Sequence, residues 1–129
     1  MITFDSHELA ALSVDIGKVG RTSTKAMIEG LEEGAESLAN AWAHNARATS
    51  GVHGKHYPNS IDWEMQLSTD IVFEVGPNPA KPQGRMSFEN GSVNQPPHLD
   101  GQRAADYEIP LIQKRVDRRL DAILGALNL

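Results

Sequence analysis

The histidines are the residues of this chain best suited to metal chemistry. There are five in 129 residues, and His53 and His56 stand close together in a glycine-rich stretch, far from His98. A zinc site needs three or four converging ligands, usually with two of them on a rigid element. The one close pair falls in an expected loop, so we expect no metal and no cofactor. A small metal-dependent hydrolase that uses His53, His56 and His98 is kept as the alternative of another class.

Nucleophilic and acid-base chemistry find equally little support. Ser92, His98 and Asp100 have the residue types of a catalytic triad, but no G-x-S-x-G elbow or oxyanion site accompanies them. The chain has no cysteine and no glycine-rich phosphate motif. The carboxylates Asp62 and Glu64 alternate with apolar residues, which indicates the solvent side of a strand. We therefore expect a protein that is not an enzyme.

Size and charge indicate one soluble domain over residues 1–129. The length suits a single core. With 12 basic and 17 acidic residues the formal charge is −5, which argues against tight DNA binding but suits a wall along which DNA slides. No apolar run approaches the roughly 20 residues of a membrane helix, and the first residues do not have the pattern of a signal peptide. We expect no association with membranes.

The elements that must position any site begin with a β-hairpin over residues 60–77. Apolar and polar residues alternate along both halves, and Ser68, Thr69 and Asp70 supply a turn. The alternating apolar residues are Ile61, Trp63, Met65 and Leu67, then Ile71, Phe73 and Val75. A hairpin alone is marginally stable, so helices must cover its apolar face.

Three helices are predicted around the hairpin. Asp5 to Glu8 resembles a capping box and predicts a short helix from near Ser6 to Gly20. A second, longer helix follows the cap formers at 22–24, and Gly30 and Gly34 give it a smooth groove for close packing. Its apolar stripe comprises Met27, Leu31, Ala35, Leu38 and Trp42.

The third helix covers residues 100–127, with Pro110 opening or kinking it. Its basic residues, Arg115 and Arg118 among them, form either a partner surface or a solvated face. Before it, the proline-rich stretch 77–99 predicts an extended loop or arm. The fold class is α+β: a small antiparallel sheet packed against the long helix and the C-terminal helix.

Several short motifs occur in a characteristic order and spacing. They are H-Y-P-N-S-I at 56–61, E-V-G-P at 74–77, S-F-E-N-G-S-V-N-Q-P-P-H at 87–98, D-G-Q-R-A-A-D at 100–106 and a closing helix that starts E-I-P. Over about residues 24 to 126 this order resembles the tail-completion family of neck proteins in long-tailed, siphovirus-type bacteriophages. Asn90 departs from the aromatic or aliphatic residue expected before the glycine.

The resemblance implies a structural virion protein, made in the bacterial cytoplasm, that forms a ring of six copies at the head-to-tail junction. Its partners would be the head-closure or connector protein, the tail terminator and the tail tube, with DNA passing through the channel without specific binding. A tail terminator ring protein is the alternative within this class. The oligomer and partner contacts expected are Phe88, Glu89, Val93, Asn94, Arg115 and Arg118.

Overall fold

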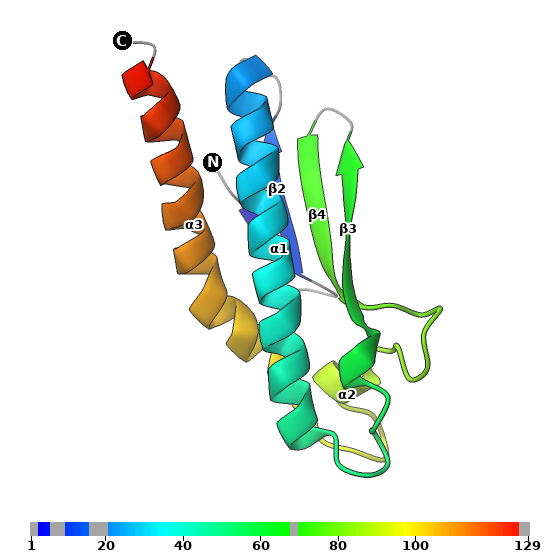
Figure 1. Ribbon diagram of the computed structural model, residues 1–129. Coiled ribbons are helices and arrows are strands. Elements are labelled where there is room, and N and C mark those ends of the chain that lie inside the picture. The colour runs from blue at the N-terminus through cyan, green and yellow to red at the C-terminus, as the bar shows by residue number, and fades with distance from the viewer. Residues whose placement is uncertain (1–2, 6–9, 16–20, 68–69, 127–129) are drawn as a thin grey trace.

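A computed structural model describes residues 3–5, 10–15, 21–67 and 70–126, and it has the expected α+β class (Figure 1). The helices are α1 (Arg21–Thr49), α2 (Ser87–Asn90) and α3 (Asp100–Ala126), and a 3₁₀ turn covers Pro58–Ser60. The strands are β1 (Thr3–Asp5), β2 (Ala10–Asp15), β3 (Ile61–Leu67) and β4 (Asp70–Pro77).

The strands form one antiparallel sheet in the order β1-β2-β4-β3, so the predicted hairpin, β3 and β4, is confirmed as half of a larger sheet. The predicted N-terminal helix is wrong, since β2 occupies part of its range and β1 ends where its cap was expected. The second half of β2 alternates apolar and polar residues, and Leu12 and Val14 stand opposite Phe73 and Ile71 of β4. Pairing with an open strand edge outweighs weak local helix signals. The remainder of that predicted helix, at 6–9 and 16–20, lies outside the described residues.

α1 supplies the centre of the core, as its apolar stripe predicts. All five stripe residues are at most 2% exposed. They pack with Ile71, Phe73 and Val75 of β4, which are also buried. β3 is covered less well, because it is an edge strand: Trp63 is half-buried and Met65 is 42% exposed.

The sheet and the two long helices share one core, as expected, and the main partner of α3 within it is α1 (Figure 1). The two glycines of α1 allow this approach. A Cβ placed on Gly34 would lie 2.8 Å from Ile112 Cγ1, and one on Gly30 would lie 3.0 Å from the Val116 side chain. The predicted close packing at these glycines is confirmed, with α3 as the partner. α3 continues through Pro110, so the proline does not begin a separate helix.

The segment 77–99 is not the extended arm that its prolines predict. It folds into tight turns, α2, and a small bridge between Ser92 and Gln95. The Gln83 side chain holds it to the loop after α1, bonding the His56 amide and the His53 carbonyl. The amides of His98 and Leu99 return to the carbonyls of α2. These hydrogen bonds keep the segment against the body of the domain. The number of prolines in a sequence does not predict such bonds.

Candidate functional site

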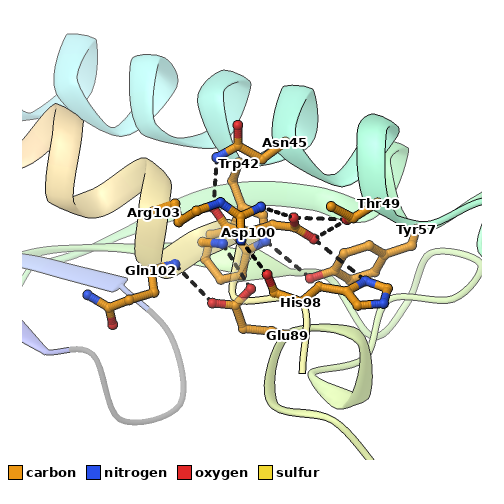
Figure 2. A network of polar contacts seen from close by, with 10 residues as sticks. Trp42, Asn45, Thr49, Tyr57, Glu89, His98, Asp100, Gln102 and Arg103 are labelled. Carbon is orange, nitrogen blue, oxygen red and sulfur yellow. Dashed lines mark hydrogen bonds and ion pairs between the residues drawn. The ribbon is translucent and has the colours of Figure 1, made fainter. Parts of the chain in front are cut away.

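A partly buried group of polar side chains, with Asp100 and Glu89 inside it, joins the end of α1, the 3₁₀ turn, α2 and the start of α3 (Figure 2). We call it the polar joint. Its members are Trp42, Asn45, Thr49, Tyr57, Glu89, His98, Asp100, Gln102 and Arg103.

Asp100, fully buried at the start of α3, is the centre of the polar joint. Its carboxylate accepts from the Thr49 hydroxyl, at 2.9 and 2.8 Å from the two oxygens, and pairs with Arg103 Nη2 at 2.7 Å. The Asn45 side-chain amide donates to the Asp100 carbonyl at 3.0 Å. A buried carboxylate is costly unless it is paired and hydrogen-bonded, and these contacts meet that need. They tie the first turn of α3 to the last turns of α1.

Glu89 of α2 caps the same helix from outside. Its carboxylate oxygens accept from the amides of Gly101 and Gln102 at 2.8 and 2.9 Å. The first amides of a helix have no partner within the helix, and a negative charge there also suits the helix dipole. Because Glu89 is only 5% exposed, these two bonds satisfy it inside the chain.

Two aromatic side chains extend the joint into the core. Trp42 Nε1 donates to the Tyr57 hydroxyl at 3.1 Å, and both residues are buried. Burial raises the pKa of Tyr57 well above its usual value, and the nearby carboxylates of Glu89 and Asp100 add to the rise while the bond from Trp42 opposes it. The Tyr57 ring stacks on Phe88 with centroids 4.6 Å apart, and Phe88 in turn contacts His98.

The Tyr57→Phe variant should lose about 1 to 3 kcal/mol of unfolding free energy, because the buried Trp42 N–H loses its acceptor. It should also change the pH dependence. Above about pH 10 an unfolded tyrosine releases its proton while the folded Tyr57 keeps it, so wild-type stability falls as the pH rises. Urea unfolding at about pH 8 and pH 11 measures both effects. An equal alkaline loss in wild type and variant would contradict this role of Tyr57.

The polar joint has the residue types of an active site but not the arrangement. His98 Nδ1 lies 3.9 Å from Asp100 Oδ2, and that carboxylate is already occupied by Thr49 and Arg103. Ser92 is exposed in the small bridge with Gln95. Among the described residues, no three His, Asp or Glu side chains are grouped so as to hold a metal ion. His53 and His56 are both exposed in the loop after α1. What the joint can do is fix how three helices meet.

The expected contact residues of α2 take different roles. Phe88 is half-buried and stacked on Tyr57, so only part of it is accessible. Glu89 is buried and caps α3, so its place in the structure is not that of a surface contact. Its role is set by the start of α3, twelve residues later in the chain, because the first backbone amides of that helix need an acceptor.

The other expected contacts lie apart from one another. Val93 and Asn94 are exposed on the Ser92–Gln95 bridge, and Val93 is completely uncovered. Arg118 is exposed on α3, whereas Arg115 is half-buried with its Nε 3.9 Å from Glu33 of α1. α2 lies at the opposite end of the molecule from the second half of α3 (Figure 1), so these residues do not form one surface.

Apart from the polar joint, the outer side of the hairpin carries a shallow hollow of about 290 Å³. Asp62, Glu64 and Glu74 line it, with Glu64 exposed, in agreement with its interpretation as the solvent side of the sheet. Lys81 Nζ lies 3.0 Å from Asp62, and this contact lowers the pKa of the Asp62 carboxyl. The hollow is an open, solvated surface.

Sequence reasoning missed Trp42, Asn45 and Thr49 as members of the polar joint. A signal existed for one of them: a tryptophan in an apolar stripe needs a partner for its indole N–H when it is buried. Nothing in the sequence pairs Asn45 or Thr49 with a residue more than fifty positions away.

Comparison with known proteins identifies no relative: no family model, no curated protein and no solved structure matches the chain. No helix in the described part of the chain is long and apolar enough to cross a membrane.

Proposed function

We propose that this chain is a structural subunit of the head-to-tail junction of a long-tailed bacteriophage. It acts as a tail-completion or neck protein and assembles into a ring, of six copies, around the DNA channel. In the virion it joins the tail tube to the head connector. The chain performs no chemistry in this role, and its net charge of −5 keeps the channel wall from holding DNA.

One observation carries the proposal: six of the nine members of the polar joint belong to the phage-like motifs. Tyr57 comes from the first motif, Glu89 and His98 from the third, and Asp100 and Arg103 from the fourth. Gly101 of the fourth motif lies directly against Trp42. The third and fourth motifs are neighbours along the chain, whereas the first reaches them from a distant position through Tyr57. Their convergence supports a resemblance of fold, on which the functional proposal depends.

Light scattering and electron microscopy of the purified chain test the proposal. We expect self-association into rings with a central opening, either alone or when tail tubes are added. Phage particles that lack the protein should show heads and tails that fail to join. A chain that stays monomeric at every concentration, does not bind tail tubes and takes up zinc stoichiometrically would favour the hydrolase alternative instead.

A further inference from the structure

One face of α3 is exposed although it carries large apolar side chains. Tyr107 is 70% exposed and Leu111 is 41% exposed. They are four residues apart and therefore neighbours on the helix surface, and the exposed residues Lys114 and Arg118 continue the same row. We call these four residues the outer stripe. Val116, which packs on α1, is on the opposite side of α3, so the outer stripe faces away from the body of the domain.

α1 and β3 carry a surface of complementary character. A shallow hollow of about 410 Å³ is lined by four glutamates of α1 and by Trp63 of β3. We call it the acidic hollow, and its glutamates are Glu29, Glu32, Glu33 and Glu36. All four are exposed, and Trp63 Nε1 donates to Glu36 at 2.6 Å, which holds the indole at the wall of the hollow.

The acidic hollow is only partly neutralised within the chain. Arg119 of α3 pairs with Glu29 and Glu33. Glu32 has no ion pair among the described residues, and the contact that Glu36 makes is with a neutral indole. The side of the hollow nearer β3 therefore keeps its negative charge beside an aromatic ring. The outer stripe offers the opposite charge beside a tyrosine and a leucine.

We infer that the outer stripe of one copy docks into the acidic hollow of the next copy. The inference rests on the proposed function and names the surfaces by which its ring would close. α3 lies on one side of α1 and β3 on the other (Figure 1), so each copy presents two different surfaces. A contact between unlike surfaces of the same chain repeats head to tail and makes a closed ring when the rotation permits.

A second copy suits these surfaces better than a nucleic acid does. The outer stripe has two positive charges beside exposed apolar area, and the chain as a whole is negative. Nucleic-acid affinity comes from neutralising many phosphates with clustered basic residues. Large exposed apolar residues beside charged ones are typical of protein interfaces, where tyrosine and arginine are enriched.

Charge exchange between the two surfaces tests the inference on the full chain. One variant combines Lys114→Glu with Arg118→Glu, and the other combines Glu32→Lys with Glu36→Lys. Each variant alone should lose the ring peak in size-exclusion chromatography with light scattering, because like charges then face each other. An equimolar mixture should restore it, because each variant then meets a surface of opposite charge. Circular dichroism checks that both variants fold, and a chain with all four changes should form rings alone.

The outcomes separate this inference from the proposed function. If the wild-type chain forms rings and both variants do so equally well, the interface lies elsewhere and the inference fails while the ring proposal stands. Loss of rings in both variants without restoration in the mixture also overturns the pairing of stripe with hollow. If the wild-type chain forms no ring even with tail tubes, the proposed function itself fails. If the wild-type chain retains DNA in a filter-binding assay and the Lys114→Glu/Arg118→Glu variant does not, while ring formation is the same in both, the outer stripe binds nucleic acid and the inference fails.

Discussion

Replacing Gly101 with alanine should lower the free energy of unfolding by about 2 to 3 kcal/mol, since overpacking a well-filled core costs amounts of this order. A Cβ on Gly101 would lie 2.5 Å from Trp42 Cε2 and 2.6 Å from Cζ2. The indole is 2% exposed and bonded to Tyr57, so it cannot move away without breaking that bond. Urea unfolding followed by circular dichroism measures the loss.

The same helix provides a matched control in Gly125→Ala. Apart from its own helix backbone and chain neighbours, no described atom lies within 4 Å of a Cβ built on Gly125. Alanine favours the helix over glycine by up to about 1 kcal/mol, so this variant should be unchanged or slightly more stable. If Gly101→Ala lowers the free energy of unfolding and Gly125→Ala raises it or leaves it unchanged, the loss at Gly101 comes from the contact with Trp42. Equal effects at both positions would contradict it.

The parts of the fold that the sequence predicts well are those whose pattern is set by their own residues. α1 has an apolar stripe with helical spacing, and its members are the buried ones. The hairpin shows a period of two on both sides of a polar turn. In both cases the local pattern and the tertiary environment require the same conformation, so no competing signal exists.

The N-terminal segment shows why other parts could not be predicted. Leu9, Leu12, Ile16 and Val19 have helical spacing, while Leu12 to Asp15 alternates as a strand does. Both periods include Leu12, and the choice depends on a partner about sixty positions away. β4 has a hairpin neighbour on one edge only, and β2 pairs with the other edge from Ala10 to Asp15.

The motifs in the sequence include most residues of the polar joint, but the sequence does not predict which of these residues contact one another. The distance along the chain from Thr49 to Asp100 is the reason, because no local rule connects residues in separate helices. Glu89 shows the consequence. The resemblance implied a partner contact for Glu89 on an extended arm, yet the start of α3 removes its side chain from solvent. A buried acceptor such as Glu89 can be identified only when the positions of its donors, the amides of Gly101 and Gln102, are known.

Removing the Glu89 carboxylate should therefore affect folding more than any loss of surface charge would. In Glu89→Ala the amides of Gly101 and Gln102 lose their acceptor together, and we expect a loss of about 2 to 4 kcal/mol from two unsatisfied or rehydrated donors. Glu89→Gln keeps one acceptor oxygen and should lose about half as much. The exposed Glu64→Ala serves as the control, with a change within about 0.5 kcal/mol.

Amide hydrogen exchange separates this cap from a general loss of packing. The amides of Gly101 and Gln102 should exchange faster in Glu89→Ala under conditions where the core of α1 stays protected, because the first turn of α3 opens locally. If these two amides keep their protection in the variant, another group satisfies them and Glu89 is not the cap. Since the first turn of α3 also carries Asp100, its opening should release Thr49 and Arg103 as well. A single buried carboxylate on α2 would then control whether the polar joint holds α1 and α3 at their shared end.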